Sequence, residues 1–217
     1  MSPSHSRFFL IGTLFELGLG GVAFVLGALT GHAPLATLRE TAQSPQGLLL
    51  ATGTGLLATL PLIAGLLLLE RCPWQPIARL KELVQTQLVP LFRSLSTWQL
   101  GLLSLAAGWG EEMLFRGWLQ TAIVNWLPGP SGIVVAVAAA SLLFGICHWL
   151  TPAYGVLAML ISAYLGVIFI ASNSLLTPVV AHAAYDFFAL VYLTSQPVES
   201  HPADSFMENA PDQPERN

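Results

Sequence analysis

The sequence predicts an all-α membrane protein, a bundle of about six transmembrane helices with one amphipathic helix on the bilayer surface. Its 217 residues are 54% hydrophobic and only 9% charged, whereas a soluble domain is about a quarter charged. Apolar runs of roughly 20 residues recur along the chain, which is the helix length that crosses the hydrocarbon core. The composition therefore indicates a polytopic protein that contacts the lipid bilayer. Its eight basic residues are too few for a protein that binds nucleic acid.

Two predicted spans open the chain, Phe8–Leu29 and Leu48–Leu69, with a polar link between them. Glu16 is the only charged residue within the first span. Because Glu16 has no companion motif, we expect it to be structural or partly interfacial.

The segment Glu70–Ser96 differs from the spans, because charged residues interrupt its apolar positions at helical spacing. Such a pattern gives a helix one apolar face and one charged face. We therefore predict an amphipathic helix that lies on the membrane surface. Its apolar positions include Ile77, Leu80, Leu83, Val84, Leu88 and Leu91.

Four more spans are predicted in the second half of the chain. They are Thr97–Asn125, Ser131–Leu150, Tyr154–Ala171 and Leu175–Thr194. After the last span the chain turns polar, with prolines and carboxylates, a composition typical of disorder. The chain is therefore expected to divide into an N-terminal unit (1–96), a core (97–194) and a disordered acidic tail (195–217).

The basic residues predict the orientation in the membrane. With six spans, the amphipathic segment and both termini share one side of the bilayer. That side holds Arg71, Arg79, Lys81 and Arg93 together with Arg7 and Arg216, and the other side holds Arg39. Because cytoplasmic loops carry an excess of lysine and arginine, we expect both termini to be cytoplasmic.

Three charged residues, Glu111, Glu112 and Arg116, lie inside the third predicted span. Each costs roughly 2.5–3.5 kcal/mol at the centre of a membrane helix, so their presence there needs a reason. Glu112 and Arg116 are four residues apart on one helical face, where they can form a structural ion pair. Glu111 is rotated by about 100° from Glu112 and is not the natural partner of Arg116. We infer that Glu111 is free for chemistry.

Two further clusters of ionisable residues occur in later spans: His148 in the fourth, and His182 with Asp186 one helical turn apart in the sixth. Each cluster alone has a structural explanation, such as a packed histidine, an intrahelical pair or a buried ion cluster. Together, a carboxylate and two imidazoles in one bundle can activate a water molecule, either as general bases or through a metal. Phe144 lies four residues before His148 and would pack around such a site.

These residues resemble the motifs of a known family. Glu111-Glu112-x-x-x-Arg116, Phe144-x-x-x-His148 and His182-x-x-x-Asp186 look like the three motifs of the CAAX protease and bacteriocin-processing family, which includes the type II CAAX prenyl endopeptidases. The resemblance covers about residues 95–195. It implies an intramembrane endopeptidase that cleaves a membrane-associated peptide or protein, prenylated or not. It also implies an integral protein of the plasma membrane, or of a thylakoid or inner membrane.

The resemblance also implies roles for the motif residues. Glu111 would be the general base and His148 would orient the attacking water, while Glu112 and Arg116 would maintain the architecture of the catalytic group. His182 and Asp186 would stabilise the oxyanion, or zinc or another divalent metal would bind Glu111, His148, His182 and Asp186. A glutamate mechanism without bound metal is the alternative to this metal site.

Asp186 departs from the family pattern, which usually has asparagine at this position. An ionised aspartate cannot donate a hydrogen bond to an oxyanion, whereas asparagine can. Asp186 would therefore be protonated, bind a metal, or orient His182.

Two other functions are compatible with an intramembrane cluster of this kind. The first is a non-catalytic scaffold or immunity factor, which is disfavoured because the motif positions all carry groups suited to chemistry. The second is an ion- or proton-coupled carrier, which is disfavoured because the sequence has no inverted repeat and no paired broken helices.

Overall fold

The computed structural model describes residues 3–197, and within this range the regular structure is entirely helical, which confirms the predicted all-α class. The predicted tail 195–217 lies for the most part outside the described residues. The elements are α1 (Pro3–Thr30), α2 (Ala36–Thr41), α3 (Pro45–Glu70), α4 (Gln75–Leu83), η1 (Val84–Leu88), α5 (Val89–Arg93), α6 (Thr97–Glu112), η2 (Met113–Gln120), α7 (Thr121–Trp126), α8 (Pro130–Cys147), α9 (Pro152–Ser172) and α10 (Leu176–Ser195).

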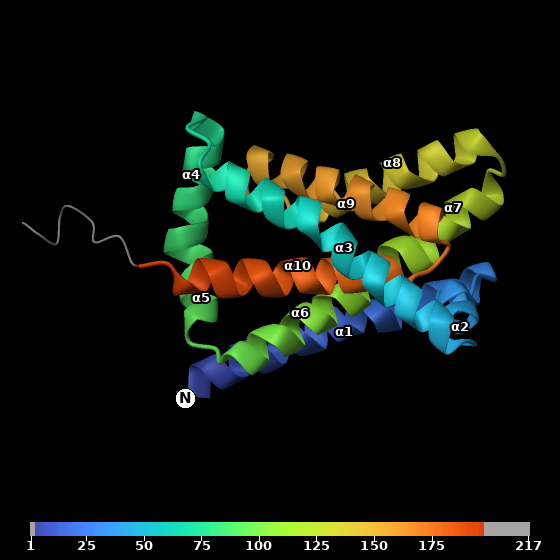
Figure 1. Cartoon of the computed structure of the whole chain (residues 1–217), viewed down its shortest axis with the longest axis horizontal. Helices are drawn as coiled ribbons and strands as arrows, with labels where there is room; N and C mark the ends of the chain where they lie inside the picture. Colours follow the sequence, from blue (N-terminus) through green and yellow to red (C-terminus); the bar gives the residue numbers. More distant parts are fainter. Residues whose placement is uncertain (1–2, 198–217) are drawn as a thin grey trace, which may run out of the picture.

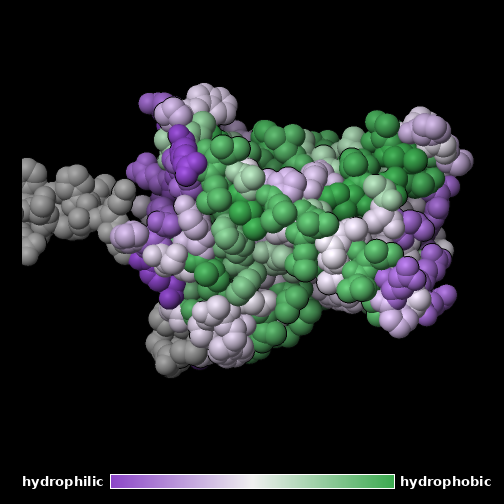
Figure 2. Space-filling model, in the orientation of Figure 1, coloured by the Kyte–Doolittle hydropathy of each residue, from purple (hydrophilic) through white to green (hydrophobic). Residues whose placement is uncertain are grey.

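Five of the described helices are long and apolar enough to cross a membrane: α1, α3, α8, α9 and α10. The third predicted span is built differently, because α6 has only 16 residues and is continued by η2 and α7. The apolar side chains of these helices cover the surface with a broad hydrophobic band, which lies between two hydrophilic ends of the molecule (Figure 2). The chain is an integral membrane protein.

The predicted amphipathic helix forms α4, η1 and α5, which run across one end of the bundle (Figure 1). Ile77 and Val89 point inward and are buried, whereas Arg79 is exposed. Two basic side chains tie this segment to the helix ends: Lys81 Nζ donates to the Glu70 carbonyl at 2.7 Å, and Arg93 Nη2 donates to the Gln196 carbonyl at 2.7 Å.

The start of α1 and the end of α10 lie at the same end of the bundle as α4 and α5 (Figure 1). The predicted arrangement of these segments on one side is therefore confirmed. That this side faces the cytoplasm stays a prediction.

The helix with the acidic pair, α6, packs between α1 and α10. Glycines allow this close packing. A Cβ at Gly108 would lie 2.8 Å from the Ala183 backbone nitrogen of α10, and a Cβ at Gly110 would collide with the Glu16 carbonyl of α1. Small residues at such crossings let membrane helices approach closely. The glycines on either side of Trp109 thus hold α6 firmly against its two neighbours.

The helix changes its winding immediately after Glu112, where the π-helix η2 begins. The motif spacing alone predicted a regular α-helix there. π-Helical segments are rare and are frequent at functional sites. The irregularity therefore directs attention to the two glutamates that precede it.

Candidate active site

Glu112 is the anchor of a buried polar network. Arg116 Nη1 donates to Glu112 Oε1 at 2.8 Å, and both side chains are fully buried. Arg116 Nη2 also donates to the carbonyl and the hydroxyl oxygen of Ser162 on α9, at 2.6 and 2.8 Å. The predicted ion pair is confirmed, and it additionally joins η2 to α9. A buried charge is tolerable because it is paired and hydrogen-bonded in this way.

The same carboxylate orients a histidine. His182 Nδ1 lies 2.8 Å from Glu112 Oε1, and since a carboxylate can only accept, the ring donates its Nδ1–H. The Nε2 atom of His182 is therefore the one turned toward Glu111. This contact joins helices 70 residues apart in the chain, and local residue spacing carries no signal for it.

Glu111 lies between two imidazoles. Its Oε1 atom is 3.7 Å from His148 Nε2, and its Oε2 atom is 3.8 Å from His182 Nε2. Both distances are too long for direct hydrogen bonds, yet atoms this far apart can share one water at about 2.8 Å from each. Oε2 is buried and has no hydrogen-bond partner within the described part of the chain. The structure thus brings the three sequence motifs together around one carboxylate.

His148 is held by the end of its own helix. Its Nδ1 lies 2.9 Å from the Phe144 carbonyl, to which the ring can only donate, so Nε2 turns its lone pair toward Glu111. The imidazole also stacks on the Phe144 ring, with 4.2 Å between centroids and 15° between planes. Phe144 therefore packs around the site as expected, and its other neighbours include Phe115 and the Arg116 guanidinium.

Asp186 lies on the open side of the cluster. Its Oδ2 atom is 3.4 Å from His182 Nε2, and 29% of its side chain is exposed. The orienting position behind the ring, at Nδ1, is occupied by Glu112. Asp186 therefore faces the same imidazole nitrogen as Glu111 does.

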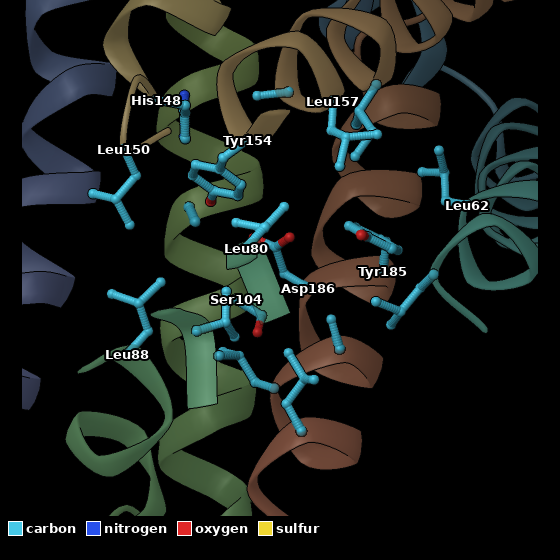
Figure 3. Close-up of a pocket in the computed structure, with 18 of the residues that line it drawn as sticks. Leu62, Leu80, Leu88, Ser104, His148, Leu150, Tyr154, Leu157, Tyr185 and Asp186 are labelled. Carbon is cyan, nitrogen blue, oxygen red and sulfur yellow. The ribbon is translucent and has the colours of Figure 1, made fainter. Parts of the chain in front are cut away.

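Glu111, His148, His182 and Asp186 all border one cavity of about 840 Å³, whereas Glu112 and Arg116 lie behind them and do not line it. Figure 3 shows His148, Tyr154, Tyr185 and Asp186 around it, together with Leu80 and Leu88 of the amphipathic segment. Most of the remaining lining is apolar, and α3, α9 and α10 contribute to it together with α1, α6 and the end of α8. A mainly apolar cavity with a few convergent polar groups is the usual form of a binding site.

Residues 93–188 match the family model described as type II CAAX prenyl endopeptidase Rce1-like. The chain contains an Rce1-like domain. No curated protein and no solved structure matches the chain significantly. At the family level, the Rce1-like domain is that of a CAAX-type intramembrane protease. Glu111, Glu112, His148, His182 and Asp186 all lie inside the matched segment.

The cavity lining extends beyond the Rce1-like domain, and one acidic residue in that outer part is inside a membrane span. Glu16 of α1 lines the same cavity as Glu111 and Asp186, although no motif connected it to them. The signal that could have identified it is its position, because an ionisable residue inside a membrane span is a functional candidate by default. Tyr154 and Tyr185 also line the cavity, and nothing in their sequence context distinguished them.

The arrangement of possible metal ligands was predicted from the family resemblance. Within residues 3–197, no three histidine, cysteine, aspartate or glutamate side chains form a group that could hold a metal ion. Glu111, His148, His182 and Asp186 border one cavity without forming such a group, and the binding of zinc or another divalent metal by them stays a prediction. The proposed chemistry uses their side chains alone.

Proposed function

We propose that this protein is an endopeptidase that hydrolyses a peptide bond of a membrane-associated peptide or protein, with Glu111 activating the attacking water. The observation that carries this proposal is the position of Glu111. Its carboxylate is buried, faces the Nε2 atoms of His148 and His182 at 3.7 and 3.8 Å, and borders a cavity of about 840 Å³.

In the first step, the water oxygen attacks the scissile carbonyl carbon while Glu111 takes one of its protons. The carbonyl π electrons move to the carbonyl oxygen, which gives a tetrahedral oxyanion. The lone pair of His148 Nε2 accepts the other water hydrogen and so aligns the attack. A general base in this position typically contributes a factor of about 10²–10⁴ to the rate.

The oxyanion needs a hydrogen-bond donor, and His182 is the candidate. With Nδ1–H held by Glu112 at 2.8 Å, a doubly protonated ring presents Nε2–H to the cavity. An ionised Asp186, 3.4 Å from Nε2, favours this protonated form. Donation by the imidazolium replaces the amide donation that the family's usual asparagine would supply.

In the second step, the intermediate collapses and the carbon–nitrogen bond breaks. Glu111 returns its proton to the leaving nitrogen, so the products are a carboxylic acid and an amine. Glu111 is then again a carboxylate, and no redox partner or further reactant is required.

The cavity and the family support one class of substrate in particular. Leu62 of α3, Leu80 of α4 and Leu88 of η1 line the cavity beside the polar cluster (Figure 3). Such walls suit the apolar part of a membrane-associated substrate, either an isoprenyl chain or a hydrophobic side chain. A prenylated CAAX-type peptide is the first candidate.

The test is cleavage of synthetic CAAX-type peptides by the protein in liposomes, with the cysteine isoprenylated or free. We expect cleavage by the wild type and none by Glu111→Gln, which keeps the size of the side chain but cannot accept the water proton. Glu82→Gln provides a matched control, because Glu82 is exposed and lies outside the cavity lining. A folded Glu111→Gln variant that still cleaves would refute the mechanism.

A further inference from the structure

Glu16 is held close to Glu111 by the crossing of α1 and α6. The contact at this crossing is between the Glu16 carbonyl and Gly110, where any Cβ would collide. Gly110 immediately precedes Glu111, and both glutamate side chains line the same cavity. A helix from outside the matched segment therefore contributes an acidic group to the wall of the site.

The Glu16 carboxylate has no basic partner at ion-pair distance among residues 3–197. Its Oε2 atom is buried without a hydrogen bond, and none of the ion pairs among residues 3–197 involves Glu16. Glu112 differs from Glu16 in this respect, because the Glu112 carboxylate contacts both Arg116 and His182 at 2.8 Å. A carboxylate placed in a membrane without compensation is expensive. Its retention beside a cavity indicates that a ligand supplies the missing partner.

The charge of the cavity wall specifies the ligand. Four acidic residues line the cavity: Glu16, Glu70, Glu111 and Asp186. Among the described residues of its lining, Lys81 is the one lysine or arginine, and its ammonium group already donates to the Glu70 carbonyl. A concave wall with an excess of one charge in a low-dielectric surrounding attracts the opposite charge.

We propose that Glu16 is a specificity-determining residue that binds a lysine or arginine side chain of the substrate, close to the scissile bond. The inference rests on the proposed function, because Glu111 defines where the bond is cut. A carboxylate and a protonated amine or guanidinium form a charge-assisted hydrogen bond, the strongest kind available to a peptide in such a cavity. Glu111 cannot take this role, since its oxygens face the two histidines.

The test compares peptides that differ at one position, with lysine in one and norleucine, of similar length but uncharged, in the other. The lysine or norleucine is placed in turn at each residue that flanks the scissile bond. All peptides are N-acetylated, so that only side chains carry positive charge. At one position, the wild type should cleave the lysine peptide with a kcat/KM about tenfold higher or more. In Glu16→Gln this ratio should fall to about 1, and in the Glu82→Gln control it should persist.

A second measurement separates this inference from the proposed function. The same labelled peptides are bound to Glu111→Gln, with and without Glu16→Gln, so that preference is measured without cleavage. A lysine preference in binding that depends on Glu16 would support the inference even if the wild type cleaved nothing, a result that would refute only the protease. No lysine preference at any position in the wild type, or an undiminished preference in Glu16→Gln, overturns the inference.

Discussion

At the scale of single residues, the two adjacent glutamates have separate surroundings. Glu112 is fully buried and accepts from Arg116 and His182 at 2.8 Å, whereas the nearest basic atoms to Glu111 are 3.7 and 3.8 Å away. The negative charge of Glu112 is thus compensated within the protein by Arg116 and His182. The surroundings of Glu111 leave oxygen atoms that can take a proton from a substrate water.

This difference predicts opposite outcomes for two substitutions. Arg116→Ala should lower the stability by about 3–5 kcal/mol, because it leaves Glu112 buried beside an empty space and removes both bonds to Ser162. Glu111→Gln should keep the fold and lose activity. Thermal unfolding in detergent measures the first effect, with the exposed Arg79→Ala as a control. If Glu111→Gln unfolds the protein and Arg116→Ala does not, the two roles are assigned wrongly.

Asp186→Asn tests how the oxyanion is stabilised. The amide keeps the size of the side chain and can donate a hydrogen bond, so a metal-free site should retain or increase its activity. If Asp186 instead ligates a metal, the change removes a charged ligand, and activity should fall and require more added zinc.

Peptide cleavage by Asp186→Asn is therefore measured with chelator and across a zinc titration. Activity that resists the chelator would argue against a metal ligand at this position. A variant that is inactive until zinc is added would instead refute the metal-free mechanism.

At the scale of helices, the site depends on how closely α1, α6 and α10 approach one another. Gly108 and Gly110 make that approach possible, and the π-helix η2 begins three residues after Gly110. The catalytic candidate on α6 is thus positioned by backbone contacts on both sides. The position of the Glu111 carboxylate therefore depends on the two helix crossings as much as on the conformation of its own side chain.

Gly110→Ala should therefore disturb both stability and activity. The added methyl group collides with the Glu16 carbonyl, and forcing α1 away from α6 should cost about 1–3 kcal/mol. Gly53→Ala on α3 is the matched control, because a Cβ there meets no atom within 4 Å. Equal unfolding temperatures for the two variants would contradict a tight crossing at Gly110.

At the scale of the whole molecule, the bundle has two unlike ends. The amphipathic segment, the start of α1 and the end of α10 lie at one end (Figure 1). The basic residues Arg71, Arg79, Lys81 and Arg93 belong to this end. The connection α2 with Arg39 lies at the other end. The excess of basic residues at the first end favours a cytoplasmic position for it.

Cysteine labelling checks this orientation. In a Cys72→Ser, Cys147→Ser background, Arg79→Cys should react with a membrane-impermeant maleimide only after the membrane is opened. Arg39→Cys should react in intact cells, because Arg39 lies at the opposite end and is exposed. The reverse pattern of labelling would place the amphipathic segment outside the cell.

The sequence was sufficient for features that lie within one helix and insufficient for those between helices. Hydropathy predicted the five helices that are long and apolar enough to cross a membrane, and four-residue spacing predicted the Glu112–Arg116 pair. The contact of Glu112 with His182, the placement of Glu16 in the cavity and the π-helix after Glu112 were not predicted. They depend on which helix faces lie together, and periodicity within a segment does not contain that information.

The closeness of Glu16 to Gly110 means that the segment matched by the family model is shorter than the set of residues that forms the active-site cavity. The matched segment 93–188 carries the motif residues, but one wall of their cavity is on α1. A chimera that joins residues 93–188 of this chain to the first spans of a relative would keep the motif residues and exchange that wall. Its choice among peptides would then follow the donor of the first helix.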